Sequence, residues 1–289
     1  PQSEPHGTRV ENINPYLVNT ADVLIKKRRI PICKAPEIHF GNQPIDDGHL
    51  ILNEEEKDKL LSESPKAIGF LRKFVGSEEF INGIERWCLW LKDAEPDELR
   101  QIPLVRRIEQ VKKFRLSSKR EATRELAEKP GIFAFISHPD SNYLLIPSVS
   151  SERRTYIPMG FMPPQVIASN LCLIIPGATR YHFGVLSSAM HMAWTRTVCG
   201  RLEVSYRYSA GIVYNNFPWP LTATDKQKQA IENAAQAVLE ARGRFPRASL
   251  ADLYDPLTMP AVLVDAHHQL DAAVDAAYAK RKFTGDSDR

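Results

Sequence analysis

Three short segments of the sequence concentrate side chains that donate hydrogen bonds. They are Ser150-Ser151-Glu152-Arg153-Arg154-Thr155-Tyr156, Thr179-Arg180-Tyr181-His182 and Ser205-Tyr206-Arg207-Tyr208-Ser209. Arginine can donate two hydrogen bonds to a guanine edge, and serine or threonine can hold a phosphate. The pattern is typical of a surface that binds nucleic acid, with these candidate contacts: Ser151, Arg153, Arg154, Tyr156, Thr179, Arg180, Tyr181, His182 and Arg207. For the first segment, an internal Arg–Glu network that orders the loop is an equally good interpretation.

No sequence motif supplies catalytic chemistry beside these donors. We find no nucleophile elbow, phosphate-cradling glycine loop or H-E-x-x-H motif, and no Ser-His-Asp set can be assigned. His191 and His267-His268 lack carboxylates or thiols at ligand spacing, and the four cysteines are too far apart for a zinc ribbon. Asn14-Pro15-Tyr16 lacks the second proline of the loop that amino-methyltransferases use, so a polar turn is the better interpretation. We expect no catalytic residue, cofactor site or metal site in this chain.

Positive charge is concentrated in one part of the chain. The whole sequence carries a net charge of only +3, but residues 100–124 hold nine Lys or Arg against two Glu. Residues 221–289, in contrast, hold nine basic and ten acidic residues. A regional excess of this kind is expected where one face meets phosphate, although a merely solvated helix face is the alternative for any single run. The candidates here are Lys112, Lys119, Arg120 and Arg124.

The elements that must position these residues change along the chain. Residues 1–20 are polar and indicate a linker, and residues 21–220 mix helices with short strands. We expect helices near 54–64, 103–128 and 187–199, and strands near 143–146, 154–157, 171–175, 181–186 and 211–214. Residues 221–289 predict a purely helical domain, because Thr224-Asp225-Lys226-Gln227 has capping-box spacing and apolar stripes follow it. The fold class is therefore α+β, with a small all-helical C-terminal domain.

Composition places the chain among ordinary globular proteins. Hydrophobic residues make up 43% and charged residues 25% of the sequence, and no apolar run approaches the ~20 residues of a membrane helix. The chain begins Pro1-Gln2-Ser3-Glu4 without a basic and apolar signal segment or an initiator methionine. We expect reduced cysteines, a cytoplasmic location and a chain that is a piece of a longer protein.

Several longer strings resemble one known family. They are Gly76-Ser77-Glu78-Glu79-Phe80-Ile81-Asn82-Gly83, Phe183-Gly184-Val185-Leu186-Ser187-Ser188-Ala189-Met190-His191, and Tyr214-Asn215-Asn216-Phe217-Pro218-Trp219-Pro220. Together with Gly200-Arg201-Leu202 and Ser249-Leu250-Ala251-Asp252-Leu253-Tyr254-Asp255, they resemble the MmeI-like restriction-modification DNA methyltransferases. The resemblance runs in order over nearly the whole chain.

This resemblance implies a target-recognition domain and a C-terminal helical domain that follow a methyltransferase domain in the same polypeptide. The parent would methylate an adenine N6 amine with S-adenosylmethionine, after flipping the base out of the duplex. The glycine-rich cofactor motif and the catalytic loop are missing from this sequence. The fragment alone is therefore expected to bind double-stranded DNA, to bind no cofactor and to be inactive.

Two hypotheses from different classes remain open. The first is a double-stranded DNA sequence reader for such a methyltransferase or for a fused restriction-modification enzyme. The second is a protein-interaction or assembly module of the same enzyme without autonomous DNA binding, in which the basic helix is merely solvated. Salt-dependent DNA binding separates the two, because only phosphate contacts release counterions. A stand-alone hydrolase or nuclease would need a nucleophile or metal cluster that the sequence does not provide.

Overall fold

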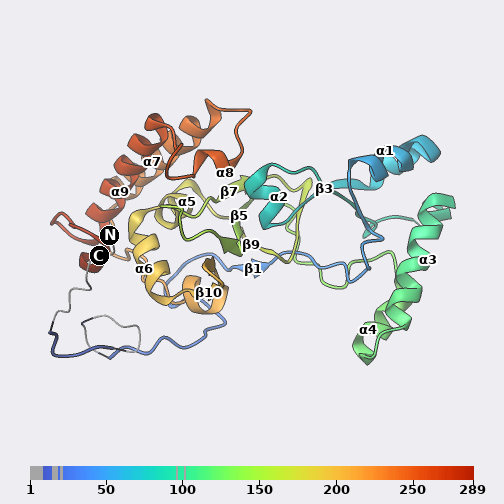
Figure 1. Cartoon of the computed structure of the whole chain (residues 1–289), viewed down its shortest axis with the longest axis horizontal. Coiled ribbons are helices and arrows are strands. Elements are labelled where there is room, and N and C mark those ends of the chain that lie inside the picture. Colours follow the sequence, from blue (N-terminus) through green and yellow to red (C-terminus); the bar gives the residue numbers. More distant parts are fainter. Residues whose placement is uncertain (1–8, 15–18, 20–21, 96, 101) are drawn as a thin grey trace, which may run out of the picture.

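The computed structural model describes residues 9–14, 19, 22–95, 97–100 and 102–289. Most of the expected 1–20 linker, including Pro15-Tyr16 of the Asn14-Pro15-Tyr16 turn, lies outside the described residues. The molecule is elongated, with two long C-terminal helices at one end and a smaller helical lobe at the other (Figure 1). Among the described residues, no helix combines the length and apolarity needed to cross a bilayer.

The lobe at the right of Figure 1, here called the distal lobe, comprises residues 50–133. Its sheet has the strand order β2-β4-β3-β8, formed by Ile51–Leu52, Trp87–Leu89, Leu71–Val75 and Val166–Ala168. Around it lie α1 (Glu54–Glu63), the 3-10 turn Pro65–Phe70, α2 (Ser77–Asn82) and α3 (Ile102–Leu116). A core of its own fills the lobe, including Leu50, Leu89, Leu104, Val111 and Phe133.

The N-terminus of α1 is capped as its sequence predicts. The Asn53 side chain accepts a hydrogen bond from the Glu56 backbone N–H at 2.9 Å, and the Glu56 carboxylate accepts one from the Asn53 N–H at 3.1 Å. This reciprocal pair satisfies two backbone donors that a helix otherwise leaves exposed.

The prediction of a single helix over residues 103–128 is wrong. α3 ends at Leu116, and α4 (Glu121–Glu125) and a 3-10 turn (Leu126–Glu128) follow after a break at 117–120. Serines favour such a break, because the Ser117 hydroxyl bonds to the Phe114 carbonyl and competes with the helix. The Arg124 guanidinium donates to the Ser118 carbonyl and fixes the second helix against the break.

The middle of the molecule is a sheet with the order β1-β9-β5-β7, formed by His39–Phe40, Cys172–Pro176, Tyr143–Pro147 and Gly160–Met162. The predicted strands at 143–146 and 171–175 are confirmed as β5 and β9. They pair antiparallel, with Leu145 opposite Ile174. Both faces are covered: Leu144 and Ile146 face the large core, and Tyr143 and Leu145 face a smaller one.

Three other strand predictions are wrong. Residues 154–157 form a turn. Residues 181–186 belong to α5 (Arg180–Leu186), because Thr179 and His182 form a capping box, in which the His182 ring accepts from the Thr179 N–H. Residues 210–214 form one π-helical turn, which the Asn216 side chain holds by donating to the Gly211 and Ile212 carbonyls.

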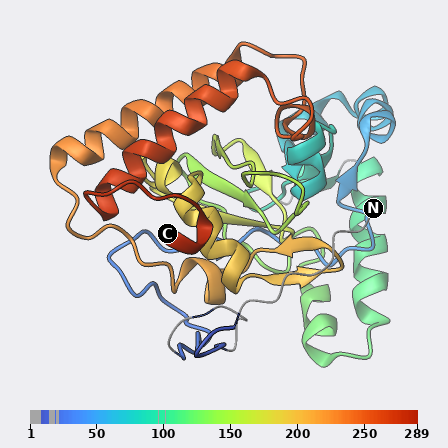
Figure 2. The ribbon, with the colours of Figure 1, turned by 60° about the vertical axis from the view of Figure 1, so that its left-hand side comes forward.

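The C-terminal region is helical, as its sequence predicts. Its helices are α7 (Asp225–Gly243), α8 (Leu250–Leu253) and α9 (Ala261–Tyr278), and α7 and α9 lie side by side (Figure 2). They do not enclose a core of their own. Ile231 and Leu270 belong to the same core as Phe183 of α5, and a Cβ added at Gly184 would lie 2.7 Å from the Ile231 side chain. This shared core, with the middle sheet and α5–α9, is here called the central lobe.

Helix α6 (Ala189–Val198) confirms the helix expected at 187–199. A small sheet has the strand order β10-β11-β6. Its strands are β6 (Val149–Ser150), which precedes α6 in the chain, and β10 (Gly200–Leu202) and β11 (Ser205–Arg207), which follow it. An extended N-terminal segment runs along the π-helical turn. Its Arg28 N–H donates to the Gly211 carbonyl, and its Ile32 N–H donates to the Asn215 carbonyl.

Candidate nucleic-acid interface

The small sheet of β6, β10 and β11, here called the hairpin sheet, brings two of the predicted segments together. Tyr206 lies opposite Ser150 and Arg207 opposite Val149, so the strand that carries Arg207 runs beside the strand that leads into the 151–154 loop. These residues are about sixty positions apart in the sequence. Arg207 is exposed, and its backbone is fixed by strand pairing on both sides. The arrangement presents a guanidinium from a rigid strand, which favours selective hydrogen bonding.

The tip of the β10–β11 hairpin was not predicted from the sequence. Leu202 pairs with Ser205, which leaves a two-residue turn of Glu203 and Val204. Glu203 has φ +53°, a conformation that costs energy for a residue other than glycine. Leu202 and Val204 are 49% and 65% exposed. The positive φ serves the tight turn itself, and the exposed Leu202 and Val204 side chains give this hairpin an apolar tip.

Arg201 is a second exposed cation of the hairpin that sequence reasoning missed. Its guanidinium lies 4.0 Å from the centroid of the buried Tyr206 ring, within the range of a cation–π contact. Gly200↔Arg207 and Arg201↔Tyr206 are paired positions, so Arg201 and Arg207 are carried by neighbouring strands. The alternation of Arg and Tyr at 206–208 is the signal that could have revealed a strand here.

The 151–154 loop follows β6 directly and is held mostly by itself. The Arg153 N–H donates to the Ser151 hydroxyl, and the Arg154 N–H donates to the Ser151 carbonyl. Arg153 is exposed and Arg154 is half-buried. Desolvation lowers the pKa of Arg154, with the charge of Asp255 opposing it. Within the described part of the chain, no salt bridge links Glu152 to either arginine, so the alternative of an internal Arg–Glu network is not realised.

A cavity of about 250 Å³ opens beside this loop. It is lined by residues of α2, of β6 and of the loop: Ser77, Glu78, Ile81, Asn82, Val149, Ser150, Ser151 and Arg154. Two of the predicted residues, Ser151 and Arg154, therefore line one depression together with Val149, the strand partner of Arg207.

Tyr156, in contrast, is buried and serves the core. Its hydroxyl donates to the Asp271 carboxylate at 2.6 Å, and its ring stacks on His267 with centroids 4.0 Å apart. Burial, followed by the Asp271 charge, raises the pKa of the Tyr156 hydroxyl. The predicted contact at Tyr156 therefore has no exposed surface with which to meet a ligand.

The segment 179–182 lies against the C-terminal helices. The exposed Arg180 donates to the Gln236 side chain of α7 at 3.1 Å. Tyr181 and His182 are half-buried and pack on Trp219, and burial lowers the pKa of His182. The hairpin sheet does not include this segment, so the structure separates it from Arg207.

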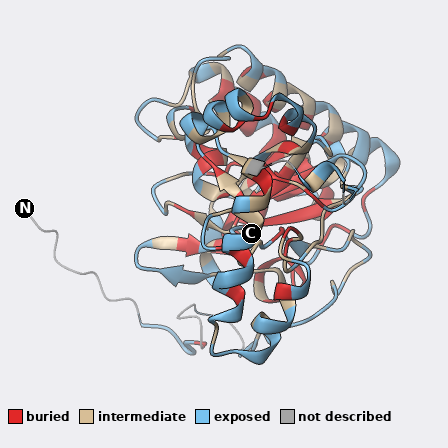
Figure 3. Cartoon of the chain, turned by 90° about the vertical axis from the view of Figure 1, so that its right-hand side faces the viewer, coloured by how far each residue is buried: buried red, intermediate tan, exposed pale blue. Residues whose placement is uncertain are grey.

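The exposed cations of α3, α4 and the break between them form a third region, here called the basic ridge: Lys112, Lys113, Lys119, Arg120 and Arg124. Figure 3 shows these helices with exposed surfaces. Among the described residues, no salt bridge involves any of the five. Five neighbouring cations without acidic partners in this part of the chain create a strong local positive potential.

Arg115, from the same basic run, is fully buried. Its guanidinium donates to the carbonyls of five residues at 2.7–3.0 Å: Pro44, Ile45, Leu126, Lys129 and Ile132. It joins the end of α3 to the segments on both sides of the ridge. Arg107 is also engaged, because it pairs with Glu56 of α1 at 3.1 Å.

The basic ridge and the hairpin sheet lie in the same half of the molecule. β10 and α4 both lie in the lower half of Figures 1 and 2, whereas α7 and α9 form the upper edge. The 179–182 segment lies against α7 at that upper side. A ligand that spans the lower half can therefore meet the ridge and the hairpin together.

Three further titratable groups, His191, Cys172 and Cys88, have the environments of core residues. His191 is fully buried beside Tyr208 and Phe217, and desolvation lowers its pKa to about 3. Burial raises the pKa of the Cys172 thiol to about 12 and also raises that of Cys88. Within the described ranges, no group of three or more His, Cys, Asp or Glu side chains is placed to hold a metal ion.

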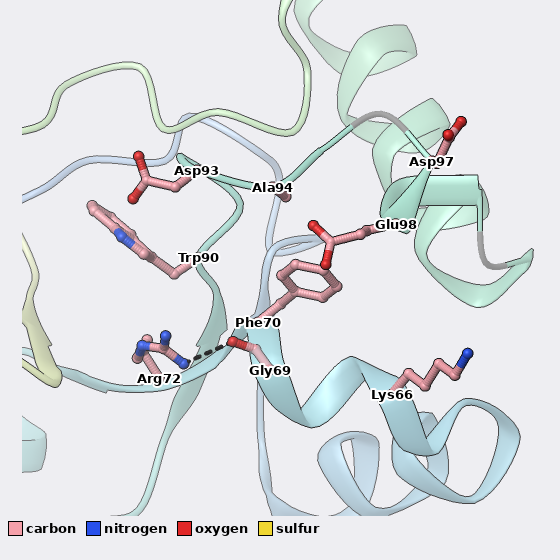
Figure 4. Close-up of a pocket in the computed structure, with 9 residues that line it drawn as sticks. All are labelled: Lys66, Gly69, Phe70, Arg72, Trp90, Asp93, Ala94, Asp97 and Glu98. Atoms are coloured by element: carbon pink, nitrogen blue, oxygen red, sulfur yellow. Dashed lines mark hydrogen bonds between the residues drawn. The ribbon is translucent and has the colours of Figure 1, made fainter.

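The distal lobe contains a larger cavity of about 630 Å³ (Figure 4). Phe70 and Trp90 line it together with charges of both signs, among them Lys66 and Asp93. Arg72 bonds to the Gly69 carbonyl at 3.0 Å. The described lining residues mix charges and include no paired nucleophile and base, so this cavity has no recognisable catalytic arrangement.

The described fold and surface define a recognition module, in which hydrogen-bond donors and unpaired cations are displayed on rigid elements. The chain belongs to the MmeI family: residues 19–221 match the MmeI target recognition domain, and residues 223–289 match the MmeI C-terminal domain. The family resemblance and the α+β fold class predicted from the sequence are therefore confirmed.

Two relatives show how far the similarity extends. The chain is 42% identical to DNA methyltransferase A of Bacillus subtilis (strain 168) over 282 residues, covering 97% of this chain and 32% of that protein. It is also similar to a structure of the type IIL restriction-modification enzyme MmeI in complex with DNA. That match has 48% identity and a TM-score of 0.94, covering 98% of this chain and 38% of the other. The chain thus spans about a third of the length of these relatives.

Proposed function

We propose that this chain recognises a double-stranded DNA sequence on behalf of a DNA methyltransferase of which it is the target-recognition part. The observation that carries the proposal is the pairing of β6 with β11, which brings the strand of the exposed Arg207 next to the strand that leads into the 151–154 loop. The similarity to MmeI, whose structure was solved in complex with DNA, supports the same function.

The two contact regions would have different tasks. The basic ridge (Lys112, Lys113, Lys119, Arg120 and Arg124) binds backbone phosphates, because its cations are exposed and have no acidic partner among the described residues. The hairpin sheet reads base edges with Arg207, aided by Ser151, Arg153 and Arg154, whereas Arg201 lies on the opposite face of the sheet, over the Tyr206 ring. Thr179 and Arg180 remain peripheral candidates, and burial removes Tyr156, Tyr181 and His182 from the first rank.

We infer the parent reaction from the family. The methyltransferase domain of the same polypeptide would bind S-adenosylmethionine and transfer its methyl group to an adenine N6 amine. The chain itself would bind no cofactor and would be inactive alone. A cytoplasmic location suits a protein that acts on bacterial DNA. In this scheme, residues 21–220 form the domain that contacts DNA, and residues 221–289 form the domain that supports it.

The test is DNA binding by this chain, followed by fluorescence anisotropy against salt, with Arg207→Gln compared to wild type. We expect Arg207→Gln to lose ~1–3 kcal/mol on the preferred sequence and little on random duplex, because a base contact specifies and a phosphate contact does not. Lys226→Gln on α7, an exposed cation outside both contact regions, is the matched control. Equal losses on preferred and random DNA would contradict base reading by Arg207.

A second candidate function is an assembly module without DNA binding of its own. One observation favours it: the N-terminal segment exposes the apolar side chains of Val23, Leu24 and Ile30, at 56%, 66% and 68%. Contiguous exposed apolar residues often mark protein contacts. Complete absence of DNA binding at low salt, by a folded chain, would favour this function over sequence reading.

A further inference from the structure

The 151–154 loop is anchored at its C-terminal end, and the anchors come from the C-terminal part of the chain. Strand pairing ends at Ser150, and the bonds made by Arg153 and Arg154 backbone groups return to Ser151. The next two residues are held differently. The Thr155 carbonyl bonds to Arg196 of α6, which in turn pairs with the C-terminal tail, and the Tyr156 hydroxyl bonds to Asp271 of α9.

The first anchor is the Asp271 carboxyl group of α9. One of its oxygens accepts the Tyr156 hydroxyl at 2.6 Å, and the other accepts the Ala189 N–H at 2.7 Å. Ala189 is the first residue of α6, so Asp271 also caps that helix. Both oxygens of this buried side chain accept a hydrogen bond, and an amide in its place would keep only one of the two acceptors.

Aromatic packing supports this anchor. The Tyr156 ring stacks on His267 with an angle of 15° between the planes, and the His267 ring bonds to the Tyr254 hydroxyl at 2.8 Å. Arg242 of α7 bonds to Tyr254 and to the Met159 carbonyl, a few residues after the loop. Both long C-terminal helices therefore contribute to holding Tyr156.

The second anchor is Arg196 of α6. Its guanidinium donates to the Thr155 carbonyl at 2.9 Å and pairs with Asp286 of the C-terminal tail at 2.5 Å. The tail is fastened in turn to α9, where Arg289 pairs with Asp275 at 2.8 Å. Thr155 is thus held by a side chain that the tail itself orients.

We propose that Asp271, Arg196 and Asp286, here called the C-terminal latch, are positioning residues that fix the 151–154 loop beside the hairpin sheet. The C-terminal helices then contribute to sequence recognition without touching DNA. This role rests on the proposed function, because it matters only if the loop reads a ligand. Residues 221–289, which include the C-terminal helices, hold nine basic and ten acidic residues. This near-neutral charge agrees with a supporting role for the helices in place of phosphate binding.

The variant that tests the latch is Asp271→Asn. An asparagine oxygen can keep the Ala189 bond, but its NH2 group then faces the Tyr156 hydroxyl, which must accept instead of donate, so the bond to a charged acceptor is lost. Asp265→Asn is the matched control, because it makes the same charge change at an exposed position of α9 that takes part in no salt bridge among the described residues. Tyr156→Phe is the second variant, which removes the hydroxyl and keeps the stacked ring.

The first readout needs no DNA. Trypsin cleavage after the exposed Arg153, followed by mass spectrometry, reports how often the loop opens. We expect cleavage in Asp271→Asn to be about tenfold faster than in wild type, with a smaller acceleration in Tyr156→Phe and none in Asp265→Asn. Equal cleavage rates in wild type and both latch variants would overturn the proposal.

The second readout is selection of binding sites from a randomised duplex pool. Asp271→Asn should select a more degenerate site, while its affinity for random duplex stays within about twofold of wild type. An unchanged site in both latch variants would overturn the recognition role while leaving the proposed function intact. A wild-type chain that binds no DNA would defeat the proposed function itself, and the proteolysis comparison would still decide the latch.

Discussion

The basic ridge and the hairpin sheet carry the same kind of side chain in different settings. On the ridge, cations such as Lys112 and Lys119 project from short helices, with neither acidic partners nor aromatic contacts among the described residues. On the hairpin sheet, Arg201 lies over a tyrosine ring and Arg207 stands on a strand paired at both edges. Exposed, unpaired charge suits a uniform polyanion, whereas a fixed guanidinium can discriminate between base edges.

The supports of the two regions differ as well. The ridge depends on one buried guanidinium, that of Arg115, which five carbonyls surround. The hairpin sheet and its loop depend on the large shared core and on the C-terminal latch. We therefore expect changes in the ridge to alter affinity and changes around the hairpin to alter selectivity.

The largest effect expected is that of Arg115→Met. Loss of the guanidinium leaves up to five buried carbonyls without their donor, so the free energy of unfolding should fall by ~3–5 kcal/mol. Urea unfolding measures this, with the exposed Lys113→Met on the same helix as control. A loss below ~1 kcal/mol would show that the ridge does not depend on Arg115.

The second effect concerns the ridge itself. Replacing Lys112, Lys119 and Arg120 together with glutamine should weaken binding to every duplex. The slope of the logarithm of the binding constant against the logarithm of the salt concentration should become shallower by roughly 0.9 for each phosphate that the variant no longer neutralises. The control is Arg100→Gln, an exposed arginine that pairs with Asp97 away from the ridge. An unchanged salt slope in the triple variant would place the phosphate-binding residues elsewhere.

The third effect is the acid sensitivity of the central lobe, where two histidines are buried. Desolvation lowers the pKa of His191 to about 3 and that of His267 well below its ordinary value. Because the unfolded state then binds more protons, stability is complete above about pH 6.5 and falls by ~1.4 kcal/mol per pH unit for each histidine below it. Asp271 acts in the opposite direction, since burial raises its pKa.

Urea unfolding between pH 7.5 and 5.5 measures this dependence. His191→Gln should remove about half of the histidine contribution to the slope, whereas His39→Gln at an exposed position should leave it unchanged. A wild-type stability that does not fall over this range would contradict neutral buried histidines.

The smallest effect expected is that of Arg180→Ala. Its guanidinium is exposed and makes a hydrogen bond to Gln236 of α7, outside both contact regions. We expect DNA affinity and site preference to change by less than ~0.5 kcal/mol. A relaxed preference at one base pair would return Arg180 to the reading surface.

The sequence predicts the long C-terminal helices and the two main central strands well, because their patterns are local. Thr224 to Gln227 carry the capping signal, and β5 and β9 are continuous apolar runs. The three-residue strands of the hairpin are too short to show a period, and β6, the strand that pairs with β11, lies more than fifty residues away. Pairing at such separation is set by tertiary packing, which one local window cannot contain.

The same limit of a local sequence window applies to the candidate contact residues. Residue types predict a donor-rich loop at 151–154, but they do not show that Tyr156 turns inward to meet Asp271, 115 positions later. Arg115 is different, because a local signal exists. It follows Leu104, Ile108 and Val111 at helical spacing on the buried face, so its burial could have been predicted.

The most direct test of the central claim is selection of sites by this chain from a randomised duplex pool, with affinity then measured against salt. The account predicts enrichment of one short sequence, with a salt slope that the ridge variant reduces and a preference that Arg207→Gln relaxes. A folded chain that shows no salt-sensitive DNA binding would contradict the claim that the two regions form a DNA-reading surface.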